Sequence, residues 1–211
     1  MPTDTWGTLP EEKRERITRI AIAEFGTKGF SAGSLNVIAR EAGIAKGSLF
    51  QDFEDKLDFF SAVCAAGSTK IAEATIGVVD TDQPFFDILR STVVQWLAFF
   101  RDDPAQQRMA FATANEIDAD ARVAVRSVAN DFYAGALRPV IDAAVESGEL
   151  RADVDRDLLM SMIVLMLRHL NSAPFDPVGD PAFAFHEMAD DDVDTIARRY
   201  IDVLERAFGP G

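Results

Sequence analysis

The sequence lacks most features of secreted, membrane-spanning or thiol-dependent proteins. Cys64 is the only cysteine among 211 residues, which excludes an intrachain disulfide and a metal site built from several thiolates. The longest apolar run, Leu158 to Leu167, is broken by Ser161 and falls short of the roughly 18 residues that a membrane-spanning helix needs. The N-terminus shows no basic segment followed by an apolar one, as a signal peptide would. We therefore expect a cytoplasmic protein with no membrane partner.

Positive charge is also scarce. The formal net charge is −14, which at first argues against nucleic acid, because proteins that bind DNA usually carry a basic face. The charge is nevertheless uneven: residues 10–56 hold eight basic and eight acidic side chains, whereas the rest of the chain holds 13 and 27. This asymmetry indicates two parts with different roles. Only the neutral N-terminal part is suited to approach a polyanion.

Arrangements typical of enzymes are missing as well. The sequence contains no nucleophile elbow, no metal-ligand spacing, no glycine-rich phosphate loop and no histidine placed as a partner for Cys64. Its two histidines are far apart in sequence. We therefore expect no catalytic residue, no bound metal and no other cofactor.

Apolar periodicity and helix-start and helix-stop signals predict an all-α chain with about nine helices. These helices are expected over residues 10–29, 34–42, 45–53, 55–78, 84–100, 103–115, 118–148, 155–171 and 190–208. Pro139 lies inside the seventh and should kink or interrupt it. The eighth is apolar nearly all round, so we expect it to be buried on more than one side.

Residues 38–53 carry the clearest pattern. Apolar residues from Ile38 to Ala42 repeat at helical spacing, Gly43 can adopt the left-handed conformation that ends a helix, and the apolar pattern restarts at Leu49. Two short helices joined by so tight a turn are typical of the helix-turn-helix, whose second helix enters the major groove of DNA.

The first 65 residues or so resemble the N-terminal domain of the tetracycline-repressor family of bacterial regulators. The matching elements, in the family's order and spacing, are Ile20 to Phe25, Lys28-Gly29-Phe30, Ile38-Ala39, Ala42-Gly43-Ile44, Lys46-Gly47-Ser48-Leu49-Phe50, Phe53 and Lys56. The resemblance implies a helix-turn-helix DNA-binding domain at residues 1–56, a connecting helix at about 55–78, and a ligand-binding and dimerisation domain at residues 57–211. It also implies a homodimer, formed through the last two long helices, on a palindromic operator in double-stranded DNA.

Residues expected to contact DNA follow from the same resemblance, position by position. Gln51 is the best candidate for reading adenine, and Lys56 matches the family's phosphate-contacting lysine. Ser34 and Asn36, near the start of the second helix, suit phosphate contacts. The full set is Ser34, Asn36, Lys46, Gly47, Ser48, Phe50, Gln51 and Lys56.

Three positions depart from the family's pattern. Phe50 replaces the usual Tyr, Asp52 replaces a common His or Tyr and would place a negative charge near the DNA backbone, and Ala45 replaces a frequent Ser that caps the helix. Phe50, like Phe53, is expected to lie partly in the core. We expect low affinity at physiological salt and a shallow salt dependence, because few phosphates are neutralised.

The C-terminal part is expected to enclose an apolar pocket for a small molecule, because it is rich in large side chains. The candidate lining residues are Trp96, Phe100, Met109, Phe111, Asn115, Phe132, Met162, Met166 and His169. Asn115, Arg168 and His169 are the polar groups that could orient a ligand.

The sequence thus predicts a DNA-binding transcriptional regulator, a repressor released by an apolar ligand. The alternative is a helical dimer that binds a ligand or a protein partner and whose DNA binding is weakened or lost.

Overall fold

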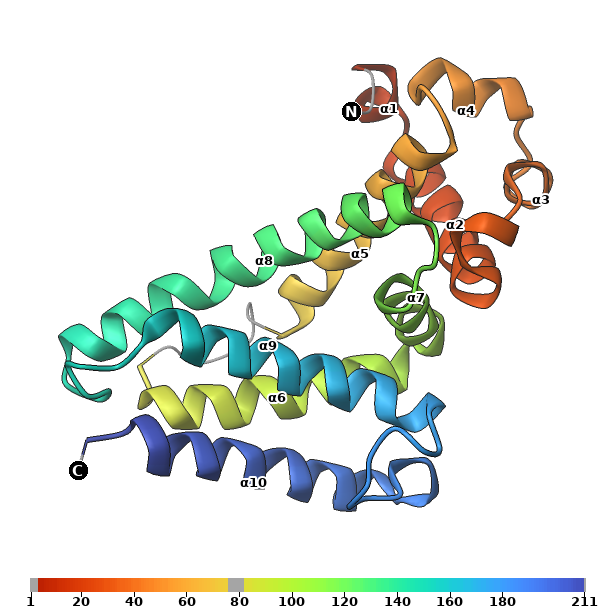
Figure 1. Ribbon diagram of the computed structural model, residues 1–211. Helices are drawn as coiled ribbons and strands as arrows, with labels where there is room; N and C mark the ends of the chain where they lie inside the picture. Colours follow the sequence, from red (N-terminus) through yellow and green to blue (C-terminus); the bar gives the residue numbers. More distant parts are fainter. Residues whose placement is uncertain (1–3, 76–81, 211) are drawn as a thin grey trace. The chain divides into compact units, whose positions relative to one another are not determined.

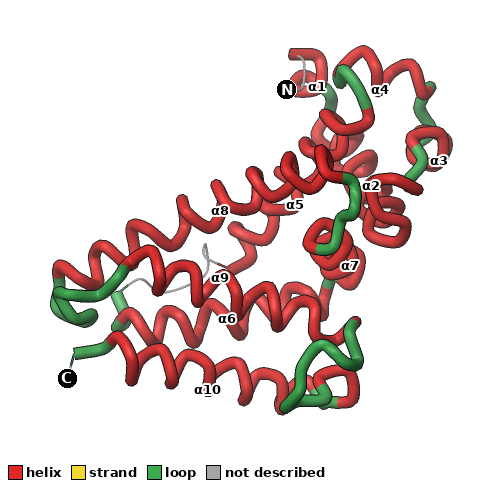
Figure 2. Tube along the Cα trace, in the orientation of Figure 1, coloured by secondary structure: helices red, strands yellow, loops and turns green. Residues whose placement is uncertain are grey.

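The computed structural model describes residues 4–75 and 82–210, which form ten α-helices and no strand (Figures 1 and 2). The all-α prediction is confirmed, and the helix that the sequence did not reveal is α1. The helices are α1 (Asp4–Thr8), α2 (Glu11–Ala32), α3 (Leu35–Glu41), α4 (Lys46–Asp52), α5 (Lys56–Thr75), α6 (Phe85–Asp102), α7 (Pro104–Ala114), α8 (Ala119–Glu146), α9 (Arg156–Ser172) and α10 (Asp190–Phe208), with 3₁₀ turns at Ala173–Phe175 and Phe185–Glu187. The predicted end of the connecting helix at residue 78 lies outside the described residues.

The chain forms two compact units. Unit 1 comprises Met1–Lys70 and Asp103–Asn130, and unit 2 comprises Ile71–Asp102 and Asp131–Gly211. Helices α5 and α8 contribute residues to both units. Compared with the DNA-binding domain predicted at residues 1–56, unit 1 also includes residues 57–70 and 103–130. The boundary of the DNA-binding domain at residue 56 therefore stays a prediction.

Unit 1 contains the helix-turn-helix. The Ser34 hydroxyl caps α3 by accepting the Val37 N–H at 3.4 Å, and Gly43 ends the helix with a φ of 65°. This left-handed conformation disfavours any residue with a Cβ. The Ile44 N–H then donates to the Ala39 carbonyl at 3.0 Å, which closes the turn before α4.

Aromatic rings fill the space behind these helices. Phe59 of α5 meets Phe25 of α2 with 6.2 Å between ring centroids, and Phe53, just after α4, with 5.0 Å. Trp6 of α1 packs edge-on against Phe53 at 5.0 Å. Such pairs add about 0.5–1.5 kcal/mol each beyond their area burial. The short N-terminal helix therefore supports the end of α4 from behind.

Helix α7 packs closely against α2 within unit 1. A Cβ on Gly26 would lie only 2.9 Å from the backbone nitrogen of Met109, so the crossing requires glycine. Beyond α7, the buried Glu116 carboxylate accepts the N–H of Phe30 at 2.9 Å and those of Ile117 and Asp118 at 3.0 Å each. This carboxylate joins the end of α2 to the loop before α8.

Unit 2 packs α10 against α6 and α9 through their apolar faces. Arg90 of α6 donates to Asp202 and Glu205 of α10. Burial acts to lower the pKa of Arg90, but these hydrogen bonds outweigh it and the pKa is raised above its ordinary value. The guanidinium therefore remains charged and bound between the two helices.

Three expectations about the long helices need correction. Pro139 does not interrupt α8, which runs from Ala119 to Glu146. Helix α9 was expected to be buried on more than one side, but in the single chain only one face is buried, and Leu158 and Leu165 are 52% and 59% exposed. Residues 156–175 are also long and apolar enough to cross a membrane by length and composition, contrary to the expectation from the shorter apolar run. One such helix is weak evidence for a membrane, since core helices have the same character.

The Glu116 contacts predict a specific loss of stability. Glu116→Ala removes the acceptor of three backbone N–H groups and should lower the free energy of unfolding by about 2–3 kcal/mol. Urea unfolding followed by tryptophan fluorescence measures this. Glu15→Ala, at an exposed position on α2, is the matched control and should cost under about 0.5 kcal/mol. Equal losses for the two variants would contradict a structural role for the Glu116 carboxylate.

Candidate functional site: the helix-turn-helix face and an apolar cavity

Helix α4 has two distinct faces. Leu49 is buried, whereas Lys46, Gly47 and Gln51 are exposed. Phe50 is 48% exposed, and the Lys46 ammonium lies 5.7 Å from the centre of its ring. The exposed face therefore combines a cation, an aromatic ring and an amide, which are groups able to contact phosphates and base edges.

The structure changes the interpretation of two departures from the family pattern. Asp52 is only 5% exposed, so it does not present a negative charge on the outer face, and that expectation was wrong. Phe50 is exposed, so the expectation that it lies partly in the core was also wrong, whereas Phe53 is buried as expected. Ala45 precedes α4 without a side-chain cap, as predicted. The departure at Asp52 therefore adds no negative charge to the exposed face of α4.

The remaining candidate DNA contacts lie around α3 and the start of α5. Ser34 caps α3, Asn36 is exposed on its first turn, and Ser48 is partly exposed on α4.

Lys56 is held within unit 1. Its ammonium donates to the Ser31 carbonyl at 3.1 Å and lies 4.7 Å from the centre of the Phe30 ring. Burial lowers the pKa of Lys56, while the nearby carboxylates, chiefly Glu116 and Asp118, act in the opposite direction. A phosphate contact by Lys56 would have to compete with these groups.

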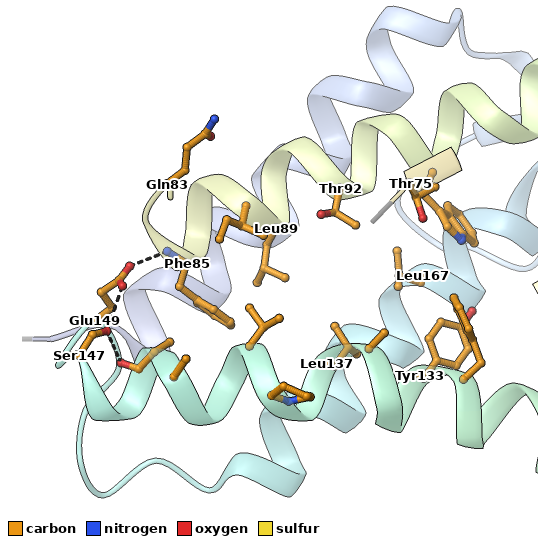
Figure 3. Close-up of a pocket in the computed structure, with 18 residues that line it drawn as sticks. Thr75, Gln83, Phe85, Leu89, Thr92, Tyr133, Leu137, Ser147, Glu149 and Leu167 are labelled. Carbon is orange, nitrogen blue, oxygen red and sulfur yellow. Dashed lines mark hydrogen bonds between the residues drawn. The ribbon is translucent and has the colours of Figure 1, made fainter. Parts of the chain in front are cut away.

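Unit 2 contains a cavity of about 390 Å³ between α6 and α8 (Figure 3). This volume lies within the range of small-molecule sites, roughly 300–1,000 Å³. Most of the wall is apolar. The lining residues are Thr75, Gln83, Phe85, Ile88, Leu89, Thr92, Trp96, Phe132, Tyr133, Ala136, Leu137, Pro139, Val140, Ala143, Ala144, Ser147, Glu149 and Leu167.

A carboxylate stands at one end of this cavity. Glu149 Oε2 accepts the N–H of Phe85, the first residue of α6, at 2.5 Å, and Oε1 accepts the Ser147 hydroxyl at 3.0 Å (Figure 3). An acid at the N-terminus of a helix is stabilised by the unpaired N–H groups and by the helix dipole. Glu149 is also one of the residues that line the cavity.

Of the nine residues that the sequence suggested for ligand contact, Trp96 and Phe132 line this cavity. Phe100, Met162 and Met166 lie in unit 2 but do not line it, and Met109, Phe111 and Asn115 belong to unit 1. His169 instead binds Asp180, with Nε2 and Oδ2 2.7 Å apart.

Sequence reasoning missed large lining residues such as Phe85 and Leu89 as well as the alanines, threonines and Glu149, because nothing in a helical pattern tells a cavity wall from a packed core. For Glu149, an acid directly after the turn that ends α8 was the available signal.

A family model for "Bacterial regulatory proteins, tetR family" matches residues 17–63, which span the helix-turn-helix. The transcriptional repressor BepR from Brucella suis is 30% identical over 144 residues, covering 68% of this chain and 61% of BepR. The matched region thus spans about three fifths of that relative. The transcriptional regulator AcrR from Shigella flexneri is 35% identical over 63 residues, which cover 30% of this chain and 29% of AcrR.

Solved structures with this fold extend over nearly the whole chain. A TetR-family regulator from Chloroflexus aurantiacus covers 100% of both chains with a TM-score of 0.64 and 23% identity. FadR from Bacillus subtilis, in complex with stearoyl-CoA, covers 90% of this chain and 96% of its own with a TM-score of 0.73 and 14% identity. The match over residues 17–63, together with the curated relatives, shows that the helix-turn-helix of this chain belongs to the tetR family of bacterial regulatory proteins.

Proposed function

We propose that the protein is a DNA-binding transcriptional repressor that recognises a palindromic operator as a homodimer and is released by a small molecule. The observation that carries this proposal is the exposed face of α4. Lys46, Gly47, Phe50 and Gln51 are presented to solvent, while Leu49 fixes the helix from behind. This division of faces is what a helix needs to enter a major groove without disturbing its own core.

The cavity of unit 2 supports the ligand part of the proposal. It is large enough for a drug-sized molecule and lies outside the unit that carries α4. Among structures with the same fold, FadR was solved with stearoyl-CoA, and AibR (TM-score 0.64, 16% identity) with isovaleryl coenzyme A and operator DNA. A ligand can release the operator only if it binds the DNA-incompetent state more tightly than the DNA-bound state.

The exposed faces of the last two long helices support a homodimer. Leu158 and Leu165 of α9 are more than half exposed, and so is Val203 of α10. Leu158 and Leu165 are seven residues apart and so lie on one face of α9, and an exposed apolar face often marks a contact with another molecule. A two-fold dimer would bury the same three residues on both copies.

A second candidate function is a dimer that binds a ligand but not DNA. The net charge of −14 and the contacts that hold Lys56 to Ser31 favour it, because both reduce the attraction for phosphates. Selection of bound sequences from a random DNA pool separates the two functions. Recovery of a palindromic site supports the repressor, whereas recovery of none supports the second candidate.

Single substitutions on α4 should separate base reading from backbone contact. Gln51→Ala should lose discrimination at one base pair of the selected site, by about 1–3 kcal/mol. Lys46→Ala should weaken binding to all DNA sequences by a similar factor. It should also lower the slope of log affinity against log salt concentration by about 1. Binding titrations at several salt concentrations measure both effects. Arg151→Ala, in unit 2, removes the same charge elsewhere and should change neither. If the wild-type protein gave a slope of log affinity against log salt of about −8 or steeper, the prediction that it contacts few phosphates would be wrong.

The dimer surface makes its own prediction. Leu165→Asp should convert the dimer to a monomer, because two carboxylates would be buried at the two-fold contact without a partner. Sedimentation equilibrium at micromolar concentration measures the molecular mass. Val123→Asp, at a 69% exposed valine of α8 in unit 1, is the matched control and should leave the dimer intact. A monomeric wild type, or a dimer that survives Leu165→Asp, would contradict the proposed surface.

A further inference from the structure

The described lining of the unit 2 cavity carries negative charge and no positive charge. Glu149 is the only carboxylate among its described lining residues, and no Lys, Arg or His lines it. The remaining polar side chains are uncharged and belong to Thr75, Gln83, Thr92, Trp96, Tyr133 and Ser147. The cavity therefore offers hydrogen bonds and one negative charge, and its lining provides no cation to pair with an anionic ligand.

The basic side chains of α6 and of the unit 2 part of α8 are Arg90, Arg101 and Arg138, and each is paired with a carboxylate of another helix. On α9, Leu167 lines the cavity but the neighbouring Arg168 does not. Arg90 of α6 is held by Asp202 and Glu205 of α10, and Arg138 of α8 lies 2.5 Å from Asp157 of α9. Residues 71–89, which lead into and begin α6, contain no Lys, Arg or His at all. None of these three arginines can turn into the cavity without giving up its own carboxylate.

Glu149 keeps capacity for a further donor. Each of its oxygens accepts one hydrogen bond, from Phe85 N–H and from the Ser147 hydroxyl, and it forms no ion pair with a described residue. A carboxylate has about four acceptor positions, so each oxygen can accept one more hydrogen bond. The N-terminus of α6 offsets part of its charge, which weakens but does not remove its attraction for a cation.

We propose that the ligand of this cavity is an amphiphile with a hydrophobic body and a single positively charged amine beside Glu149, and that the cavity rejects fatty acids and acyl-coenzyme A thioesters. This assignment rests on the proposed ligand site and narrows its chemistry. Phosphates of coenzyme A are recognised by Arg and Lys, which this lining lacks. A carboxylate ligand would meet Glu149 as a like charge, which is costly in an apolar cavity.

Four probes that share a ten-carbon chain test the assignment: decylamine, 1-decanol, decanoate and decanoyl-coenzyme A. Isothermal titration of the full-length protein at pH 7, with each probe below its micelle concentration, gives the four dissociation constants. Decylamine is expected to bind roughly tenfold or more tightly than 1-decanol, and decanoate and decanoyl-coenzyme A more weakly than the alcohol. The emission of Trp96, which lines the cavity, should change on binding.

Two matched variants locate the charge that is responsible. Glu149→Gln keeps an oxygen for the Phe85 N–H and can still hydrogen-bond Ser147, so it removes the charge while preserving the helix start. It should abolish the preference of decylamine over 1-decanol. Glu146→Gln removes the same charge from an exposed residue outside the cavity and should leave the preference unchanged. Thermal unfolding of both variants checks that each is folded.

The outcomes distinguish this inference from the proposed function. If decanoate or decanoyl-coenzyme A binds as tightly as decylamine, or if Glu149→Gln keeps the preference, the charge assignment is wrong while the cavity remains a ligand site. If none of the four probes binds, both the assignment and the ligand part of the proposed function are wrong.

Discussion

The buried Glu116 carboxylate is the contact on which the architecture of unit 1 most depends. It joins the Phe30 N–H to the loop after α7, across 86 positions of sequence, and satisfies three backbone donors at once. Leaving such donors unpaired inside a protein is costly, so the α7–α8 loop cannot separate freely from the end of α2. The close crossing at Gly26 acts in the same direction. The unit that carries the helix-turn-helix is therefore completed by residues 103–130.

Local patterns in the sequence were sufficient for most of the fold. The turn at Gly43 and the helix starts near residues 34 and 155 follow from backbone chemistry that acts over a few residues. In the structure Gly43 has a positive φ, and Ser34 and Asp155 cap their helices. The short helix α1 was missed, because its packing depends on Trp6 meeting Phe53, far along the chain. A contact between residues far apart in the sequence depends on tertiary structure, so the local spacing of apolar residues does not predict it.

The candidate sites were less accessible from sequence than the fold. On α4, a one-dimensional pattern could not decide that Asp52 faces inward and Phe50 outward, because a seven-residue helix offers barely two turns of periodicity. In unit 2, large aromatic and sulfur-containing residues were the natural candidates, yet of these candidates only Trp96 and Phe132 line the cavity, while Phe100 and Met166 are buried core residues. A cavity forms where side chains are too small to fill the space between helices, as the alanines and threonines are here. These residues are common on any helix, so their presence in a sequence does not predict a cavity.

The two faces of α4 also bear on how such a protein can diverge. Leu49 and the following Phe53 hold the helix through buried contacts, while the groups on its exposed face contribute little to packing. Substitutions at exposed positions usually change stability by less than about 0.5 kcal/mol. The surface chemistry of α4 can therefore vary between descendants of one ancestor while the core behind it stays constant. The DNA sequence that α4 recognises can therefore change without a prior increase in the free energy of unfolding.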